Sequence, residues 1–456
     1  MYPSTLPTPL FSSFSLLLIT IVTLLSTITP AFAAPYCQLR SVSATSTSGP
    51  QPTGVSSSTG NSTSGGGDVE DVVAAAWYPG WLATKFPPSG VSWSKYTHAT
   101  FAFGITTTDP STIDLVDQEQ TLTQFVTAAH QNNVKALLSI GGWTGSRYFS
   151  PAVTAENTPK FIAAITALVK QYNLDGIDFD WEYPGQGGIG CNQVTDDDPQ
   201  NFMNFLQALR KDPVGQNLIL SAAVGVAPFT NSKTSDLTSF GESLDWVAIM
   251  NYDVNGAWSS STGANAPLNN CQPTPTASAT QAFADWTKVN VPANKLVLGV
   301  PSYGRAFYVA SSTALGSDGN FTSAFPNFAF TKPMPKGDND DQNPTPDICG
   351  NNEGYSGTST FHDLVGSFLT TSGTAAPGMV YQFDSCSQTP FIYDPTQGLL
   401  LSYDDAQSFA AKGDFINSNG LKGFSMWHDV GDYNDILINS ISTAMNIEAG
   451  KGAGRR

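Results

Sequence analysis

The segment LDGIDFDWEYP, residues 174–184, alternates acidic with apolar side chains from Ile177 to Glu182. Alternate side chains of an extended strand share a face, so Asp178, Asp180 and Glu182 point one way. Phe179 and Trp181 point the other way. The Cα atoms of successive acidic residues in this row are about 6.6 Å apart. Like charges are therefore crowded, which should raise the pKa of at least one of the three carboxyls. Such a row suits general acid catalysis, and Glu182, the last of the three, is the expected proton donor.

Short apolar runs of this kind alternate with helical patterns throughout the chain after residue 67. Eight segments are expected to be strands: 72–78, 99–103, 136–140, 176–181, 218–224, 246–251, 296–300 and 423–427. Helical patterns lie at 122–132, 159–171, 199–210, 276–289, 405–416 and 435–446. Strands that alternate with helices predict the α/β class and a parallel (β/α)8 TIM barrel, whose functional groups gather at the carboxyl ends of the strands.

One gap in this pattern is too long for a single crossover helix. Residues 301–422 separate the seventh strand from the eighth. Residues 306–383, rich in Phe, Gly, Asn and Pro, are therefore expected to form a small α+β insertion domain between strand 7 and helix 7. The TIM-barrel catalytic domain would comprise residues 68–305 and 384–448, followed by a tail at 449–456.

Composition excludes two broad classes. The 456 residues include 20 basic and 37 acidic side chains, which leaves a formal charge of −17. A nucleic-acid-binding protein needs a basic surface, so no nucleic-acid partner is expected. Hydrophobic residues make up 40% of the chain and aromatic residues 11%, which is enough for a core and excludes disorder throughout.

The first 33 residues are typical of a secretory signal peptide. An apolar run at 14–28 is too short to span a bilayer and is followed by Ala31 and Ala33 at the spacing of a cleavage site. Residues 34–67 form a Ser/Thr-rich linker, and Asn61 and Asn320 begin N-glycosylation sequons. The mature protein is expected to be a secreted, extracellular glycoprotein without a membrane anchor.

Six segments together resemble the motifs of glycoside hydrolase family 18, the chitinases. The most specific is the four-acid run DGIDFDWE at 175–182. The others are TH (97–98) with FAF (101–103), SIGG (139–142), MNYD (250–253), GVPSYGR (299–305) and GFSMW (423–427). The resemblance spans about residues 70–446, and the long insertion is similar to that of the secreted fungal and bacterial subgroup with an extra α+β domain.

This resemblance implies a chitinase that hydrolyses β-1,4-N-acetylglucosaminide bonds by substrate-assisted retaining catalysis. Glu182 would protonate the glycosidic oxygen while the acetamido oxygen of the substrate attacks the anomeric carbon. Asp180 would orient the acetamido group and stabilise its positive charge, and Tyr252 would hydrogen-bond its carbonyl. Asp178 would share a proton with Asp180, and Ser139 would hydrogen-bond the inner acid.

The resemblance also implies a sugar-binding groove. Trp427, at the end of the eighth strand, matches the tryptophan that floors the −1 site. The other matched positions are Phe103, Trp143, Met250, Asp253, Trp258, Tyr303 and Arg305. The expected partner is chitin or a chitooligosaccharide, bound by a monomer. No cofactor is implied, and the histidines lack metal-ligand spacing, so no metal is expected.

The first strand departs from the family pattern. It reads AWYPGW at 76–81 where chitinases more often have Gly-Tyr-Tyr, so the resemblance does not carry the usual tyrosine contact to the innermost acid over to this chain. The remaining tryptophans, among them Trp81, are given no groove role.

Five cysteines in an oxidising compartment should form two disulfides and leave one over. Cys37 is the expected odd one, and the other four allow three pairings. Cys191 and Cys271 follow strands four and six, on the catalytic face, so we expect them to pair. Cys349 and Cys386 would then form the second disulfide and join the insertion to its return strand.

Two alternative functions stay open from sequence. An endo-β-N-acetylglucosaminidase acting on N-glycans would use the same chemistry. A chitin-binding lectin would bind without cleaving, although such relatives usually lose the terminal acid that Glu182 retains here.

Overall fold

The computed structural model describes residues 72–447 except 232, 272–276, 342–345 and 353. The expected signal peptide (1–33), the linker (34–67), Cys37, Asn61 and the tail (449–456) lie outside the described residues. Within the described part, no helix combines the length and apolarity needed to cross a lipid bilayer.

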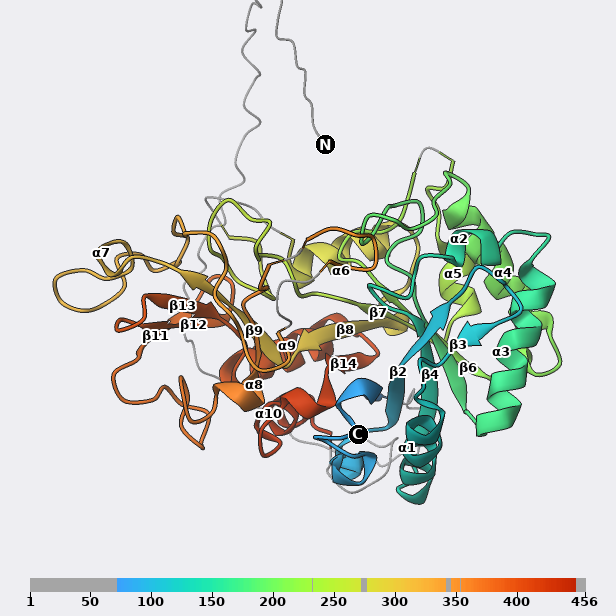
Figure 1. Ribbon diagram of the computed structural model, residues 1–456, viewed down its shortest axis with the longest axis horizontal. Helices are drawn as coiled ribbons and strands as arrows, with labels where there is room; N and C mark the ends of the chain where they lie inside the picture. The colour runs from blue at the N-terminus through green and yellow to red at the C-terminus, as the bar shows by residue number, and fades with distance from the viewer. Residues whose placement is uncertain (1–71, 232, 272–276, 342–345, 353, 448–456) are drawn as a thin grey trace, which may run out of the picture. The chain divides into compact units, whose positions relative to one another are not determined.

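Eight parallel strands close into a barrel (Figure 1). They are β1 (Val73–Pro79), β2 (His98–Thr106), β4 (Lys135–Gly141), β5 (Gly176–Asp180), β6 (Ile219–Val224), β7 (Trp246–Ile249), β8 (Leu296–Pro301) and β14 (Gly423–Trp427). Their order is β1-β14-β8-β7-β6-β5-β4-β2, and β1 also pairs with β2 to complete the ring. The short β3 (Ile113–Asp114) pairs antiparallel with the end of β2. The predicted TIM barrel is confirmed, with each of the eight strands where the sequence placed it.

The main helices are α1 (Glu119–Gln131), α3 (Thr158–Tyr172), α4 (Asp198–Lys211), α5 (Thr238–Ser243), α6 (Ala279–Lys288), α9 (Ala406–Asn419) and α10 (Ile436–Ala444). Three others are single turns: α2 (Phe149–Ala152), α7 (Ser311–Ala314) and α8 (Phe361–Leu364). Local signals set their ends. In α9, for example, Asp405 and Ser408 form a capping box at the start, and Gly420 ends the helix with a φ of +66°.

The alternation along β5 separates packing from chemistry. Phe179 lies 5.5 Å from the Phe205 ring of α4, and Trp181 stacks 5.2 Å from Phe149 of α2. Both side chains are buried in the layer between the barrel and its helices. A separate apolar cluster packs among the strands: Val73, Ala75, Trp77, Leu137, Ala223, Trp246, Ala248 and Val297.

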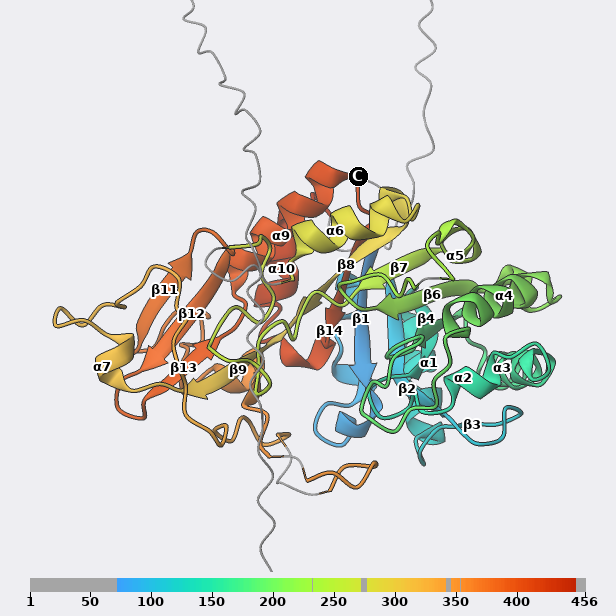
Figure 2. The ribbon, with the colours of Figure 1, turned by 90° about the horizontal axis from the view of Figure 1, so that it is seen from above.

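The insertion contains a five-stranded antiparallel sheet, in the order β10-β9-β13-β12-β11. Its strands are β9 (Tyr303–Tyr308), β10 (Thr358–Thr360), β11 (Val380–Asp384), β12 (Thr389–Asp394) and β13 (Leu399–Ser402). Figures 1 and 2 show this sheet on the opposite side of the barrel from α3 and α4. Because β12 and β13 pair with β11 and β9, the sheet continues to Ser402, past the expected limit at residue 383.

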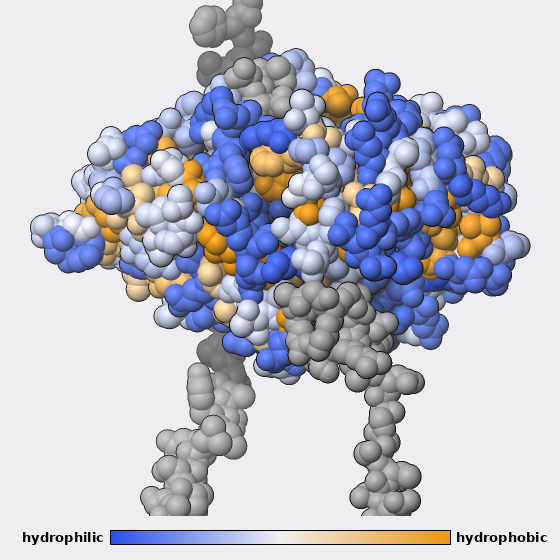
Figure 3. All heavy atoms as spheres, turned by 90° about the horizontal axis from the view of Figure 1, so that it is seen from below, coloured by the Kyte–Doolittle hydropathy of each residue, from blue (hydrophilic) through white to orange (hydrophobic). Residues whose placement is uncertain are grey.

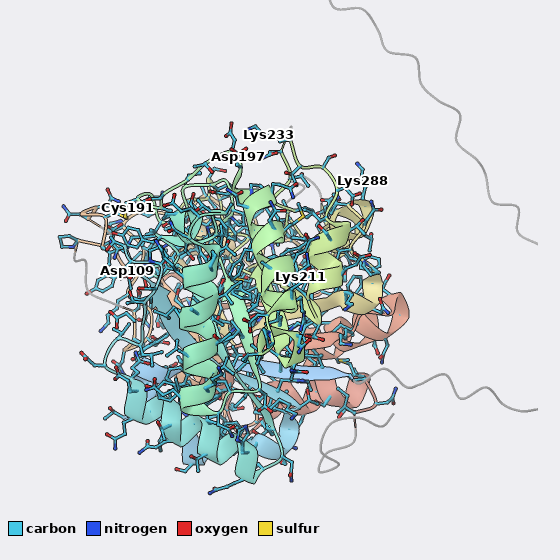
Figure 4. The ribbon with its side chains drawn as sticks, turned by 90° about the vertical axis from the view of Figure 1, so that its right-hand side faces the viewer. Asp109, Cys191, Asp197, Lys211, Lys233 and Lys288 are labelled. Atoms are coloured by element: carbon cyan, nitrogen blue, oxygen red, sulfur yellow. A yellow bond between two sulfur atoms is a disulfide. The ribbon has the colours of Figure 1, made fainter. Side chains whose placement is uncertain are left out.

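The predicted disulfide partners are wrong. Cys191 bonds to Cys349, and Cys271 bonds to Cys386. Each bond therefore joins a barrel loop to the insertion, whereas the prediction paired the two barrel-loop cysteines with each other and Cys349 with Cys386. The reason is that the insertion folds back against both loops, which the order of the cysteines along the chain does not reveal. Figure 4 labels Cys191 on its loop after β5.

The surface is polar. Figure 3 shows one face on which hydrophilic side chains predominate and apolar ones form smaller patches between them. Ion pairs also connect neighbouring segments at the surface. Lys233, after β6, lies 2.7 Å from Asp197 at the start of α4, and Figure 4 shows the two side chains together.

Candidate active site

The innermost carboxyl of the β5 row is held by three donors. Asp178 is 1% exposed, and its Oδ2 accepts from Trp77 Nε1 at 3.0 Å and from Ser139 Oγ at 2.8 Å. Its Oδ1 accepts from Ser221 Oγ at 2.6 Å. Burial raises the pKa of Asp178, and the three hydrogen bonds oppose that rise. The expected contact from Ser139 is therefore present, and the carboxyl is fixed in one orientation.

The middle carboxyl has unmet hydrogen-bonding capacity. Asp180 is buried, and its Oδ1 has no partner among the described residues. Burial, followed by the charges of Glu182 and Asp178, raises the pKa of Asp180 well above its ordinary value. A buried carboxyl oxygen without a partner is suited to bind a proton or a donor group of a ligand.

Glu182 lies just beyond the end of β5 and is half-buried. Its N–H donates to Ser146 Oγ at 3.1 Å, and its carbonyl oxygen accepts from Asn192 Nδ2 at 2.8 Å. Burial raises the pKa of Glu182 to about 8, the charge of Asp253 adds to the rise, and a hydrogen bond with Tyr183 opposes it. Glu182 is therefore protonated at neutral pH, as a general acid has to be.

The first acid of the motif has a different environment. Asp175 accepts hydrogen bonds from the Ala136 N–H at 2.9 Å, from Lys135 Nζ at 2.9 Å and from His130 Nε2 at 2.7 Å. These contacts tie the start of β5 to the start of β4 and to α1. Asp175 does not line the cavity into which Asp180 and Glu182 open.

The carboxyls of Asp180 and Glu182 open into a cavity of about 930 Å³, which we call the main cavity. Its volume is that of a small-molecule site. The predicted site residues that line it are Phe103, Trp143, Asp180, Glu182, Met250, Tyr252, Asp253, Trp258, Arg305 and Trp427. Asp178, Ser139 and Tyr303 do not line it themselves. Asp178 bonds to Ser139 and to the lining residue Trp77, and Tyr303 bonds to the lining residue Asp253.

Tyr252 follows β7 and is half-buried. Its ring lies 6.1 Å from that of Tyr303. Burial raises the pKa of Tyr252 well above the ordinary value, and the charges of Tyr303 and Asp180 add to this. The phenol therefore keeps its proton and is a hydrogen-bond donor at the main cavity.

Aromatic rings form one side of the main cavity. The Trp427 ring lies 5.6 Å from Phe103, stacked, and 6.1 Å from Trp77. Trp81 lies 6.1 Å from Phe103 and 6.2 Å from Trp427, and it is 51% exposed. Trp81, which the sequence left without a groove role, is thus a cavity-lining residue. Flat aromatic faces of this kind fit the C–H faces of a pyranose ring.

An ion pair builds the opposite wall. Asp253 Oδ1 accepts from Arg305 Nε at 2.8 Å, from Arg305 Nη2 at 2.5 Å and from the Tyr303 hydroxyl at 2.7 Å. The Arg305 guanidinium lies 4.9 Å from the ring of Trp258. Trp258 is 60% exposed and Trp143 44%, so both present apolar faces at the rim of the cavity.

Comparison with known proteins assigns this arrangement to a family. Residues 74–432 match the family model described as Glycosyl hydrolases family 18. The chain belongs to glycosyl hydrolase family 18. The match spans both the barrel, from β1 to β14, and the inserted sheet.

Several known proteins are similar to this chain over most of its length. A chitinase-like effector of Moniliophthora roreri is 43% identical over 378 residues, 81% of this chain and 92% of the relative. Chitinase A1 of Niallia circulans is 32% identical over 329 residues, 68% of this chain and 42% of the relative. The crystal structure of a chitinase from Rhizomucor miehei superposes with a TM-score of 0.73 at 30% identity, covering 81% of this chain and 99% of that one.

Besides Trp81, four residues of this family-18 site had no role in the sequence-based prediction. Trp77 and Ser221 supply two of the three donors to Asp178. Strand geometry predicts both contacts. The side chain of Trp77 lies on the face of β1 that points into the barrel, and Ser221 of β6 lies opposite Asp178 of β5. Tyr183 and Tyr355 line the main cavity, and Tyr355 belongs to the insertion. No local pattern in the sequence places Tyr355 there.

One group of three carboxyls in the described part of the chain has the spacing of a metal site: Asp338, Asp340 and Asp363. These residues do not line the main cavity. Lys85 Nζ lies 3.7 Å from Asp340 and 3.4 Å from Asp363, so a lysine already serves as their cation. We assign no metal role to this group.

Proposed function

We propose that the protein is a secreted chitinase, which hydrolyses β-1,4-N-acetylglucosaminide bonds in chitin and chitooligosaccharides by substrate-assisted retaining catalysis. The observation that carries the proposal is the row Asp178–Asp180–Glu182, whose last member is protonated at neutral pH and faces an aromatic-lined cavity. Family membership and the similarity to named chitinases support it.

In the first step Glu182 donates its proton to the glycosidic oxygen, and the bond from that oxygen to the anomeric carbon breaks. The acetamido oxygen of the same sugar forms the new bond to this carbon, which gives an oxazolinium ion. Glu182, now a carboxylate, takes a proton from the water that opens the ring. The product keeps the configuration of the substrate because two inversions have occurred.

The other polar groups act on the acetamido group. The unpartnered Oδ1 of Asp180 accepts the acetamido N–H and stabilises the positive charge that develops on the ring. The Tyr252 hydroxyl donates to the acetamido oxygen. Asp178, held by its three donors, shares a proton with Asp180 as the charge changes.

A second candidate function is chitin binding without cleavage. Relatives from two Moniliophthora species, 43% and 40% identical, carry the name chitinase-like effector. The aromatic lining of the main cavity would serve binding as well as catalysis.

One experiment with a labelled N-acetylglucosamine hexamer distinguishes chitin hydrolysis from chitin binding without cleavage. The parent should cleave it, and Glu182→Gln should bind it and cleave it on the order of 10²–10⁴-fold more slowly. Glu156→Gln, at an exposed glutamate, is the matched control and should cleave like the parent. A parent that binds without cleaving contradicts the chitinase proposal and supports the binding function. Equal cleavage by Glu182→Gln contradicts the assignment of the acid.

Secretion is part of the same proposal and rests on residues 1–33. Expression of the full chain in a fungal host should deliver the protein to the medium with Ala34 at its N-terminus. Retention of the apolar run in the recovered protein would contradict the signal-peptide assignment.

A further inference from the structure

A second cavity of about 510 Å³ shares no lining residue with the main cavity. It lies among the segment after β1, the segment after β14 and the short helix α8 of the insertion. Phe86, Tyr96, His362, Asp429, Asp432 and Asp435 are among the residues that line it. Its volume lies in the range of sites for small molecules. The chemistry described above does not use it.

Three carboxyls face this second cavity, and two of them are fixed by neighbours. Asp432 accepts hydrogen bonds from backbone N–H groups at the start of α10, including that of Ile438 at 2.9 Å. Asp435 Oδ1 accepts from Ser92 Oγ at 2.6 Å. Asp429 accepts from the adjacent Val430 N–H at 2.8 Å, and no side chain of the described residues donates to it. Asp429 is therefore the carboxyl with the most capacity left for a ligand.

The buried side chain of Tyr96 also lines the second cavity. Tyr96 is 5% exposed and lines the second cavity, and its hydroxyl has no hydrogen-bond partner among the described residues. The charges of Asp429, Asp432 and Asp435 all act on this phenol and raise its pKa further after burial. A buried hydroxyl without a protein partner, next to three carboxyls, marks a place where a ligand completes the hydrogen bonding.

The charge of the second cavity is not balanced from within. Lys85 lines it, but its Nζ pairs with Asp340 and Asp363, which do not line it. The three lining carboxyls are not close enough together to form a metal-binding group, since the only such group in the described part of the chain lies elsewhere. A larger cationic ligand fits better than a single ion.

Aromatic side chains add an apolar surface to the acids. Phe86 and His362 lie edge to face, with ring centroids 5.3 Å apart, and both line the second cavity. Carboxylates together with aromatic faces suit a ring that carries a positive charge on a polar edge.

We propose that the second cavity binds a protonated amino sugar, a glucosamine unit, whose ammonium group donates to the Asp429 carboxylate and the Tyr96 oxygen. The sugar ring packs against Phe86 and His362. A partly deacetylated chain would thus have a binding site besides the main cavity. Burial raises the pKa of Asp429 to about 8 and that of Asp432 to about 6, so Asp429 is protonated at neutral pH in the empty cavity and releases its proton to solvent when the ammonium group binds.

The test uses the full protein with Glu182→Gln, so that hydrolysis does not interfere; blocking of the main cavity rests on the proposed function, and the Asp429 and Tyr96 variants test the second cavity separately. The main cavity is saturated with an N-acetylglucosamine tetramer, and a glucosamine trimer is then titrated by calorimetry. We expect the trimer still to bind. Adding Asp429→Asn should weaken this binding about tenfold, because a charged hydrogen bond is lost. Adding Tyr96→Phe should weaken it about threefold to fivefold.

Asp117→Asn is the matched control, since it removes one negative charge from an exposed residue that lines neither cavity. It should leave trimer binding unchanged. Three results would overturn the proposal: complete displacement of the trimer by the neutral tetramer, equal binding by Asp429→Asn, or equal weakening by Asp117→Asn. Unchanged affinity of each variant for the neutral tetramer shows that the variant is folded.

Discussion

Two cavities of this molecule each contain a carboxyl whose pKa is raised to about 8, and their architectures differ. In the main cavity Glu182 ends a row of acids that one strand sets at alternate positions. In the second cavity Asp429 belongs to a loop after β14, near acids that are fixed to the start of α10 and to Ser92. Burial is the largest cause of both shifts.

The difference shows what a raised pKa indicates. The shift reports that a carboxyl has been removed from water, and it does so equally in both cavities. Catalysis also needs a neighbour that is able to stabilise charge on the substrate. Glu182 has one in Asp180, whose Oδ1 is unpartnered, whereas the acids near Asp429 are bonded to α10 N–H groups and to Ser92. The neighbouring acid Asp180 therefore distinguishes Glu182, a general acid, from Asp429, a carboxyl that we propose to bind a cation.

The largest expected effect concerns that neighbour. Asp180→Asn removes the charge that stabilises the oxazolinium ion, and kcat on N-acetylglucosamine oligomers should fall on the order of 10²–10³-fold. Asp117→Asn loses the same charge at an exposed position and should keep the parental rate. A loss of less than tenfold in Asp180→Asn would mean that the row contributes little beyond Glu182.

The two disulfides offer the next comparison, because only one adjoins the main cavity. Cys191–Cys349 lies beside Asn192, which bonds the Glu182 carbonyl, whereas Cys271–Cys386 joins the loop after β7 to the turn after β11. They close loops of similar length, with separations of 158 and 115 residues. Replacing either pair by serine should cost about 4–5 kcal/mol of unfolding free energy.

Only loss of Cys191–Cys349 should also raise KM, by about tenfold. This bond joins the loop after β5 to the insertion segment that contains Tyr355, and both line the main cavity. Urea unfolding and steady-state kinetics on both double variants check this. Equal KM values in the two variants would contradict a link between this disulfide and the site.

A smaller effect is expected at the inner acid. Trp77→Phe removes one of the three donors to Asp178, and kcat should fall about tenfold while KM changes little. Trp77→Tyr, which restores the residue type more usual in the family, should recover most of the rate. Equal rates in the Phe and Tyr variants would show that the hydrogen bond does not matter.

The smallest expected effect is on the pH dependence of the unfolding free energy, to which a carboxyl in each cavity contributes. The folded protein holds Glu182 with a pKa of about 8 against an ordinary 4.5, and Asp429 with about 8 against 3.8. Each group's contribution to stability is full below its ordinary pKa and is lost as the pH rises through about 8. Glu182→Gln and Asp429→Asn should each flatten the fall in unfolding free energy between pH 5 and pH 8. Slopes equal to that of the parent would contradict the shifts.

The barrel and the acid row could be predicted because both depend on local patterns. Period-two alternation fixes which face Asp178, Asp180 and Glu182 share, and short apolar runs at regular spacing mark the strands. The same alternation would also have found Trp77, whose side chain has the inward phase of β1.

The rest depended on how the insertion folds back on the barrel. Cys349 meets Cys191, and Tyr355 reaches the main cavity, only because the segment before β10 returns to the groove. Trp81 lies in the short 3-10 turn Gly80–Leu82 directly after β1 and is exposed there beside Phe103 and Trp427. Such long-range placement has no signature in the local sequence.

The dependence of kcat/KM on pH tests the central claim most directly, because it reports the ionisation of Glu182 in the free enzyme. Glu182 must be protonated to act, and its pKa is about 8. The rate on a neutral N-acetylglucosamine oligomer should therefore persist through pH 7 and fall tenfold per pH unit above about 8. A basic limb near pH 5 would show that Glu182 ionises like an exposed carboxyl and would contradict the account.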